Sequence, residues 1–301
     1  MSAVTLFTII FILYLLMELL PGSPFNDEKL NATQKALLMA KYGLDKPFLT
    51  RFFIYFGNLL HGDFGVSYVI TMDLPVRTML ETRLPVTIRI GVQALVIGVI
   101  IGLAWGILAA LKKNTWVDSS ATFFSVLGFS VPSYVFALLL VFGLAFKLKW
   151  FPILYSTKHP IVSSILPTIA LAMYIIATMA RYARSEMIEC LNSEYILLAK
   201  AKGIAQNKII IRHALRNTLV PIITVVAPLV VGLITVSVVV EQIFGVPGLG
   251  QLLLSGIKNN DYNVISAVAL VYSFLHITIM LVVDILYGII DPRIRVAGGK
   301  S

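Results

Sequence analysis

Long apolar runs, separated by short polar segments, dominate the chain. A helix needs about 18 to 20 apolar residues to cross about 30 Å of hydrocarbon, at about 1.5 Å per residue. Six stretches meet or nearly meet that length, at residues 3–20, 86–111, 121–146, 165–183, 219–240 and 264–290. Inside a bilayer the backbone must satisfy its own hydrogen bonds, and runs of this length do so as helices. The pattern therefore predicts an all-α membrane protein with six transmembrane helices.

The first run is ambiguous, because an N-terminal apolar stretch can also be a signal peptide. It has no basic residue before it and carries Glu18 near its far end. A signal peptide needs a basic n-region and a small-residue cleavage site, whereas Leu-Leu-Pro-Gly follows here at residues 19–22. This composition favours a membrane span.

The overall composition supports a membrane protein. Hydrophobic residues make up 58% of the 301 residues and charged residues only 13%, whereas soluble domains contain about 25% charged residues. This composition excludes a disordered chain and a nucleic-acid-binding module, so no nucleic-acid partner is expected. The single cysteine, Cys190, excludes a disulfide-stabilised secreted scaffold.

The net charge of +9 is informative by position, because short cytoplasmic loops of membrane proteins are enriched in Lys and Arg. The six spans place three basic segments on one face, at residues 112–113, 181–216 and 293–300. The short loops of the opposite face carry fewer basic residues, namely Lys147, Lys149, Lys158 and Lys258. The first face is therefore predicted to be cytoplasmic, with both termini on that side.

Residues 21–84 are too many for a simple connection, and they are expected to form an extracytoplasmic helical segment. Asn31 is placed to cap a first helix, which ends at Gly43, and Asp45 is placed to cap a second, which runs to about Leu60. The second helix carries five aromatic residues, Phe48, Phe52, Phe53, Tyr55 and Phe56. Aromatic residues at this density beside a membrane favour an interfacial helix over a platform for a ligand.

The loop after the fifth predicted span, residues 241–250, contains several turn-forming residues. Pro247 followed by Gly248 predicts a type II turn. Apolar residues on both sides favour a re-entrant segment that packs into a protein-lined outer vestibule, rather than an ordinary surface turn. The residues of interest in this outer loop are Phe244, Pro247, Gly248 and Gly250.

Residues 185–218 form the only predicted cytoplasmic segment that is both long and helically patterned. Ser193 or Asn192 is placed to cap a short helix that runs to about Lys202, and Gly203 is placed to end it. The chain must therefore turn at this glycine.

The same segment carries an apolar stripe. Leu191, Tyr195 and Leu198 follow the i, i+4, i+7 spacing of one helix face. Asn207 then starts a second helix, which leads into Pro221. Two short helices that leave the membrane and return with such a stripe predict a docking element, and the alternative is a basic amphipathic helix that lies on anionic lipid.

Two blocks of this segment are characteristic. Residues 194–203 read Glu-Tyr-Ile-Leu-Leu-Ala-Lys-Ala-Lys-Gly, and residues 213–217 read His-Ala-Leu-Arg-Asn. The pair resembles the EAA loop of permease subunits from binding-protein-dependent ABC importers, and specifically the first membrane subunit of oligopeptide and dipeptide importers. Further blocks match in order along almost the whole chain, at residues 20–24, 42–47, 62–65, 244–250, 261–262 and 291–294.

The chain departs in places from the general EAA motif, which is Glu-Ala-Ala, three residues, Gly, nine residues and Ile-x-Leu-Pro. The positions that match this form are Ala199, Gly203 and Leu215. The positions that depart from it are Leu197, His213 and Arg216, which stand in place of Glu, Ile and Pro. The departures fit the peptide-importer branch, whose own version contains the Ala-Lys-Ala-Lys-Gly and His-Ala-Leu-Arg-Asn blocks.

The resemblance implies the type I ABC importer permease fold and a subunit that forms half of a translocation pathway for oligopeptides or dipeptides in a prokaryotic cell membrane. It implies a second, similar permease, two cytoplasmic ATPase subunits and an extracytoplasmic peptide-binding protein as partners, besides the lipid bilayer. The residues it assigns to ATPase coupling are Leu191, Glu194, Tyr195, Leu198, Ala199, Lys200, Ala201, Lys202, Gly203, His213, Leu215, Arg216 and Asn217. The sequence has no Gly-x-x-x-x-Gly-Lys-Ser/Thr phosphate loop, so neither a catalytic residue nor a cofactor is expected.

Four ionisable residues fall in or near the predicted spans: Glu18, Arg89, His276 and Asp284. Such residues are candidates for function, but the first two lie near span ends, which favours a structural role. Asp284 lies about 10 Å inside the cytoplasmic end and needs a partner, which Arg181 or Arg184 can supply; a proton relay is the alternative. His276 is interpreted as a core residue rather than a metal ligand, because no second ligand stands at metal-binding spacing.

A self-contained secondary transporter or channel is the main alternative to an importer subunit. Such a transporter would be expected to show paired broken helices, an internal repeat and coupling-ion carboxylates near the midplane, and none of these is evident in the sequence. A membrane enzyme fits least, because the sequence offers no set of nucleophile, base and oxyanion donor.

Overall fold

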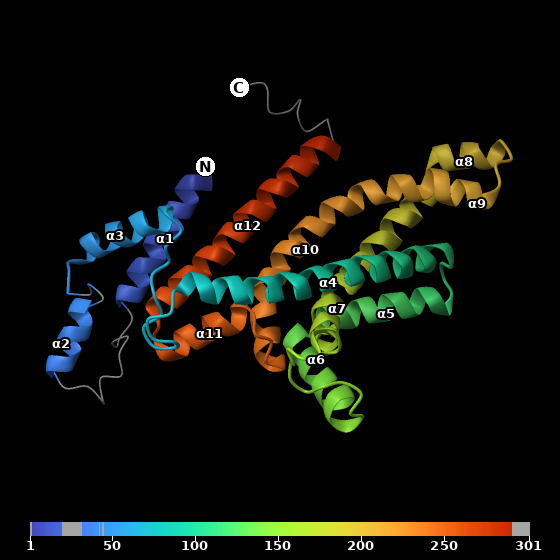
Figure 1. Cartoon of the computed structure of the whole chain (residues 1–301). Coiled ribbons are helices and arrows are strands. Elements are labelled where there is room, and N and C mark those ends of the chain that lie inside the picture. The colour runs from blue at the N-terminus through green and yellow to red at the C-terminus, as the bar shows by residue number, and fades with distance from the viewer. Residues whose placement is uncertain (1, 20–31, 42, 44, 291–301) are drawn as a thin grey trace, which may run out of the picture. The chain divides into compact units, whose positions relative to one another are not determined.

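The computed structural model describes residues 2–19, 32–41, 43 and 45–290. Over this part of the chain the regular elements are helices, apart from one isolated bridge between Val66 and Pro75. They are α1 (Ser2–Leu19), α2 (Ala32–Lys41), α3 (Phe48–Leu60), α4 (Val76–Leu111), α5 (Trp116–Ser130), α6 (Ser133–Leu140), the π-helix η2 (Val141–Lys147), α7 (Pro160–Leu191), α8 (Glu194–Ala201), α9 (Gln206–Lys208), the π-helix η3 (Ile209–Ala214), α10 (Leu215–Phe244), α11 (Leu249–Asn259) and α12 (Tyr262–Ile290) (Figure 1). The all-α prediction is confirmed.

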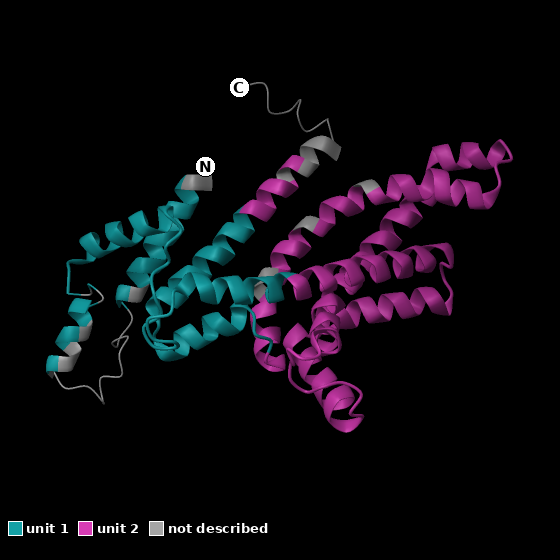
Figure 2. Ribbon diagram, viewed as in Figure 1, with its two compact units in different colours: residues 1–88, 246–277 teal, residues 89–245, 278–301 magenta. Residues whose placement is uncertain are grey.

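The chain divides into two compact units (Figure 2). Unit 1 contains residues 1–88 and 246–277, and unit 2 contains residues 89–245 and 278–301. Helices α4 and α12 each contribute residues to both units.

Several helices are long and apolar enough to cross a membrane. Within the described residues, four pass this test: Val76–Leu111, Pro160–Leu191, Gln206–Leu233 and Tyr262–Val283. The number rises to six if each of two bent pairs is one span, and these pairs are Trp116–Ser130 with Ser133–Lys147 and Val236–Phe244 with Leu249–Asn259. The first predicted span coincides with α1, in which Val4–Leu16 is a shorter apolar helix. A multi-span membrane protein is therefore confirmed.

The third predicted span, residues 121–146, is wrong as a single helix. Helix α5 ends at Ser130, and the chain resumes a helical course at Ser133 after a bend of 105°. Val131, between them, has the extended backbone angles φ −91° and ψ 116°. Pro132 explains the break, because proline lacks an N–H and disfavours helical geometry in the residue before it.

In unit 1, α3 packs its aromatic residues against α1. Phe52 is 1% exposed, and its ring lies 5.2 Å from that of Phe11 in an edge-to-face arrangement. The rings of Tyr14 and Tyr55 stack at 5.3 Å. Phe53 is an exception and remains 62% exposed. Packing between two helices thus accounts for most of the aromatic density that suggested an interfacial helix.

Glycine residues, rather than polar capping residues, mark the ends of α2 and α3. Gly43 and Gly62, just beyond α2 and α3, have φ angles of 66° and 75°. The N-cap of α3 is Pro47, without a side-chain hydrogen bond, so the predicted cap at Asp45 is wrong. The predicted cap at Asn31 lies outside the described residues.

A buried carboxylate ties the loop before α4 to the start of α12 in unit 1. Asp261 is fully buried and accepts a hydrogen bond from the Ser67 hydroxyl at 2.5 Å. It also accepts hydrogen bonds from the backbone N–H groups of Tyr68, Val69 and Ile70 at 3.0 to 3.1 Å. These four donors replace the water that the carboxylate loses on burial.

Helices α4 and α7 approach closely in unit 2. A Cβ added at Gly102 would lie 2.5 Å from the Met179 Cβ, and one added at Gly106 would lie 2.4 Å from the Ala180 carbonyl oxygen. Real side chains do not fit at such distances, so glycine is required for this packing. Small residues at helix contacts are typical of membrane bundles, in which van der Waals packing drives association.

Candidate functional site

A helical hairpin joins α7 to α10, and Figure 1 shows its arms α8 and α9 side by side. We call residues 192–214 the α8–α9 hairpin. Asn192 is the C-cap residue of α7, and Ser193 is the N-cap residue of α8. The second arm begins at Gln206 and continues through η3 into α10, in agreement with the predicted helix start near Asn207.

A buried cluster anchors the hairpin to α4 and to the end of α7. Ile196 and Ile209, one from each arm, are fully buried. The other buried members are Ala110, Met187, Cys190, Ala199 and Ala214. The Cys190 Sγ lies 2.8 Å from the Tyr195 hydroxyl and 3.4 Å from the Ala214 carbonyl oxygen. The hairpin is thus a packed part of unit 2 and not a loose loop.

The hairpin exposes several large apolar side chains. Tyr195 and Leu198 are 42% and 57% exposed, as the predicted stripe requires. Leu191, the third predicted member, instead packs against the buried cluster, because the helix is interrupted after it and the stripe does not continue. Two further exposed apolar residues of the hairpin, which the sequence interpretation missed, are Leu197 and Ile211. We call Tyr195 and Leu198 the hairpin apolar face.

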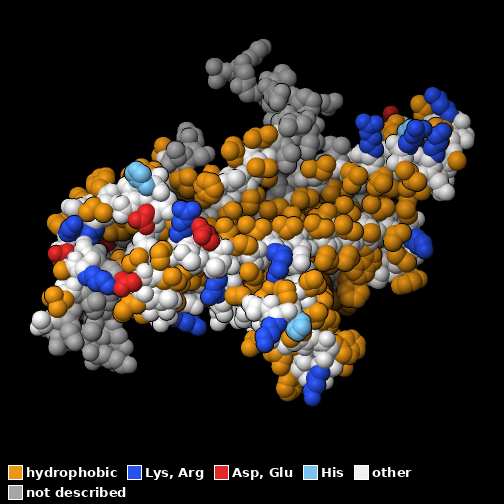
Figure 3. Space-filling view, viewed as in Figure 1, with side chains coloured by type: hydrophobic (Ala, Val, Ile, Leu, Met, Phe, Trp, Pro, Cys, Tyr) orange, Lys and Arg blue, Asp and Glu red, His pale blue; other side chains and the backbone are white. Residues whose placement is uncertain are grey.

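Basic side chains gather over the hairpin (Figure 3). The exposed charged members are Glu194, Lys200, Lys202, Lys208 and Arg212. The other residues of the predicted coupling set fall into two groups: Ala201, Arg216 and Asn217 are exposed, whereas His213 and Leu215 are half-buried. An apolar face with a cationic rim is suited to binding a partner with an acidic margin.

Gly203 closes α8 in a Schellman motif. Its φ is 69°, its N–H donates to the Lys200 carbonyl at 2.9 Å, and the Ile204 N–H donates to the Ala199 carbonyl at 3.2 Å. The predicted left-handed turn at this residue is confirmed. No atom lies within 4 Å of an added Cβ, so the conformation and not a lack of space selects glycine within this chain.

The outer loop has a different turn from the predicted one. Gly245, with φ 62°, ends α10, whereas Gly248 is extended, with φ −108° and ψ −173°, and is the N-cap residue of α11. A type II turn needs a positive φ at its third residue, so the predicted turn at Pro247 and Gly248 is wrong. Phe244, Gly248 and Gly250 are buried and Pro247 is half-buried, so the loop is not an ordinary surface turn.

Most of the ionisable residues near the spans have partners. The Glu18 carboxylate pairs with Arg51, and Arg89 donates to the Tyr155 hydroxyl. Arg184, one of the two predicted partners of Asp284, pairs with Asp118. The side chain of Asp284 lies outside the described residues.

No metal site is found in the part of the chain that the structure describes, where no three His, Cys, Asp or Glu side chains come together. His276 is exposed on α12, so its interpretation as a core residue of this chain is wrong.

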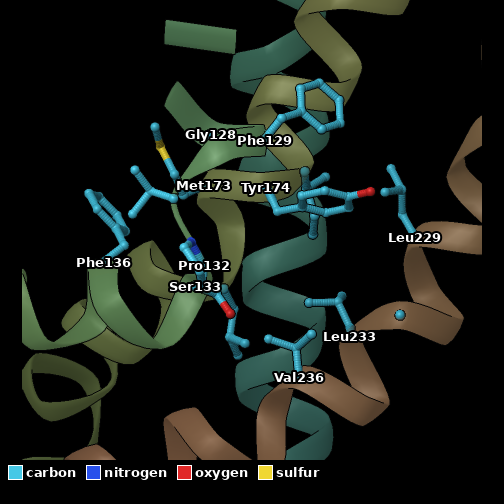
Figure 4. Close-up of a pocket in the computed structure, with 14 residues that line it drawn as sticks. Gly128, Phe129, Pro132, Ser133, Phe136, Met173, Tyr174, Leu229, Leu233 and Val236 are labelled. Atoms are coloured by element: carbon cyan, nitrogen blue, oxygen red, sulfur yellow. The ribbon is translucent and has the colours of Figure 1, made fainter. Parts of the chain in front are cut away.

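Two neighbouring cavities lie in unit 2. The apolar cavity, of about 270 Å³, lies where α5 breaks into α6 and is lined by residues of α5, α6, α7 and α10 (Figure 4). The polar cavity, of about 310 Å³, lies between α5 and α7. Phe129 lines both.

Comparisons with known proteins agree with this architecture. The chain matches the family described as binding-protein-dependent transport system inner membrane component over residues 102–296. It is 43% identical to the dipeptide transport system permease protein DppB of Lactococcus lactis, over 97% of this chain and 95% of the relative. It is 41% identical to the oligopeptide transport system permease protein OppB of Salmonella typhimurium, with the same shares covered.

A solved structure also resembles the chain. The crystal structure of an amino acid ABC transporter with histidines matches with a TM-score of 0.56 and 16% identity, over 69% of this chain and 92% of that chain. At this identity the match shows the fold alone, which this chain shares with a chain of that ABC transporter.

Proposed function

The chain belongs to the family of binding-protein-dependent transport system inner membrane components, and we propose that it is the transmembrane subunit of an ATP-driven importer of dipeptides or oligopeptides. It forms half of the translocation pathway in a prokaryotic cell membrane. The dipeptide and oligopeptide permeases that it resembles cover nearly its whole length, which supports peptides as the cargo.

The importer needs partners that this chain does not replace. A second, similar permease completes the pathway, two ABC ATPase subunits hydrolyse ATP in the cytoplasm, and an extracytoplasmic binding protein delivers the peptide. The missing phosphate loop supports this division of labour, because the chain has no means of holding the phosphates of ATP. The chain is a non-catalytic subunit.

The α8–α9 hairpin is the observation that carries the proposal. Its hairpin apolar face is exposed, its rim is cationic, and its base is fixed by buried residues of both arms. Such a surface transmits force only if a partner covers it, and the positive-inside rule assigns it to the cytoplasm. We therefore assign ATPase coupling to this hairpin, with Gly203 as its turn and with His213 to Asn217 continuing into α10.

In this proposal the outer loop, residues 241–250, lies at the extracytoplasmic end of the pathway, opposite the α8–α9 hairpin. Phe244 and Gly248 are buried, and apolar residues surround the turn between α10 and α11. This burial supports a re-entrant segment at the outer vestibule. Residues 21–84, with their packed α1–α3 contact, are assigned to the extracytoplasmic side.

Copurification and uptake together test the proposal. The tagged chain, purified from its native membrane, is expected to bring with it a second permease and two ABC ATPase subunits. Uptake of labelled dipeptide and tetrapeptide is expected to be lost when the chain is deleted and restored when it is supplied again. Uptake of every tested peptide at the wild-type level in the deletion strain would contradict the proposed function.

A further inference from the structure

The polar cavity gathers charged and hydroxyl-bearing side chains between α5 and α7. Its polar side chains are Thr122, Ser125, Ser130, Arg181, Arg184 and Ser185. Both α5 and α7 belong to segments apolar enough to cross a membrane. Polar and ionised side chains in such segments face a protein interior or a water-filled space, because hydrocarbon cannot solvate them. The cavity therefore opens to water or to protein.

The two guanidinium groups of the cavity differ in their charge balance. The Arg184 Nη2 donates to the Asp118 Oδ2 at 2.9 Å, and its Nε donates to the Oδ1, so this pair is neutral. Among the described residues, Arg181 makes no hydrogen bond and no ion pair; its guanidinium carbon lies 4.6 Å from the centroid of the Phe129 ring. The cavity thus retains one uncompensated positive charge, on Arg181.

Stacking leaves the hydrogen-bonding capacity of Arg181 free. A guanidinium group has five N–H donors in its plane, and an aromatic ring beneath that plane satisfies none of them. Arg181 is exposed, and the Phe129 ring lies against its guanidinium group. The planar donor fork that remains free matches the two oxygens of a carboxylate.

We propose that Arg181 is a specificity-determining residue that binds a carboxylate of the peptide in transit, an inference that rests on the proposed function. A carboxylate both neutralises the positive charge of Arg181 and accepts hydrogen bonds from two of its N–H groups. The hydroxyl groups of Ser125 and Ser130 line the same cavity and offer further donors to it.

The apolar cavity lies next to the proposed carboxylate site, because Phe129 lines both cavities. Phe129 and Tyr174, whose rings meet edge to face at 5.5 Å, line the apolar cavity, and Phe129 also lines the polar one (Figure 4). Tyr174 and Arg181 are seven residues apart on α7, which corresponds to about 10 Å at the helical rise. An extended peptide covers that distance with about three residues. A peptide whose carboxylate lies on Arg181 therefore places an apolar side chain within reach of the apolar cavity.

Uptake of matched tripeptides tests the inference. The peptides are Ala-Gln-Ala as its C-terminal amide, which has no carboxylate, the free acid Ala-Gln-Ala, and Ala-Glu-Ala, which has a second carboxylate. Their affinities for the binding protein are measured separately, and uptake is compared at saturating binding protein. Wild type is expected to import the free acid about tenfold better than the amide, which corresponds to about 1.4 kcal/mol.

Three variants separate charge, geometry and general damage. Arg181→Gln is expected to lower uptake of the free acids to the level of the amide and to leave the amide unchanged. Arg181→Lys keeps the charge but loses the planar fork, so an intermediate ratio is expected. Lys112→Gln removes an exposed cation outside the cavity and is expected to keep the wild-type ratio.

Each contrary outcome has a distinct meaning. A ratio of free acid to amide that is the same in wild type and Arg181→Gln overturns the inference. Equal loss of all three peptides, together with loss of the second permease on purification, overturns it in favour of an ion pair with that permease. Failure of wild type to import any peptide that its binding protein holds overturns the proposed function, and this inference with it.

Discussion

Gly203 determines the turn of the α8–α9 hairpin because it adopts a left-handed backbone conformation. Its φ of 69° costs a residue with a Cβ about 1 to 2 kcal/mol, and a β-branched residue more. No atom lies within 4 Å of an added Cβ, so within this chain the whole cost comes from the backbone and none from a clash. The buried residues Ile196 and Ile209 each contribute about 1.5 to 3 kcal/mol. Substitution is therefore expected to distort the turn while the hairpin stays folded.

Three substitutions at this position form a graded series. Asn accepts the left-handed region better than other residues with a side chain, so Gly203→Asn is a matched control of similar bulk to Val. Peptide uptake, normalised to the amount of assembled complex, is expected to fall in the order Gly, Asn, Ala, Val. Hydrogen exchange of the α8 amides is expected to rise in the same order, because the strained turn frees the last carbonyl groups of the helix.

Two results would refute this reasoning. Equal uptake by wild type and Gly203→Val would mean that the turn geometry does not matter for coupling. Uptake by Gly203→Asn as low as that by Gly203→Val would mean that side-chain size and not backbone strain is limiting, which would point to a close contact with a partner at this corner.

Three further predictions concern other parts of the chain. Leu198→Asp puts a charge on the hairpin apolar face and is expected to reduce ATPase copurification at least about tenfold, with Leu198→Ala less severe; unchanged copurification and uptake would disprove the docking assignment. Asp261→Ala removes the acceptor of four hydrogen bonds, two of them buried, and is expected to destabilise unit 1 by about 3 kcal/mol or more, measured as a lower melting temperature. An unchanged melting temperature would show that these hydrogen bonds do not stabilise the unit. The topology is tested in a background in which Cys190, which is buried and a poor reporter, is replaced by Ser. A cysteine introduced at Lys158 is expected to react with a membrane-impermeant thiol reagent on intact cells, whereas one introduced at Lys200 is expected to react only after permeabilisation. The reverse pattern would overturn the orientation.

The local sequence was sufficient to predict the backbone conformation at positions where a single residue determines it. The turn at Gly203 follows from its place between two helical patterns, and the structure confirms it. Pro132 also indicates a helix break, but the apolar residues on both sides of it led to the prediction of one continuous span. The turn after α10 was not readable, because Gly245 and Gly248 both permit a positive φ, and which of them adopts it depends on where packing ends the helix.

Tertiary contacts account for the remaining differences. Asp118 and Arg184 are 66 residues apart, and their pairing depends on how α5 packs against α7, which a single sequence does not state. The predicted stripe included Leu191, although the predicted cap at Ser193 or Asn192 already placed this residue before the helix, and the chain does turn at Asn192 and Ser193. Leu191 is half-buried against the cluster as a result, whereas Leu197 is exposed on α8.

The course of α7 connects the hairpin to both cavities. One continuous helix, Pro160–Leu191, lines the apolar cavity with Tyr174 and the polar cavity with Arg181, and it ends where the hairpin begins. Arg181 lies about 15 Å from that end at the helical rise. The other arm continues into α10, which reaches the apolar cavity with Leu229 and Leu233. If the proposed ATPase partner displaces the hairpin, we expect α7 to carry the motion to Tyr174 and Arg181. Along α10 we expect Pro221 and Pro228, which lie before Leu229, to permit bending.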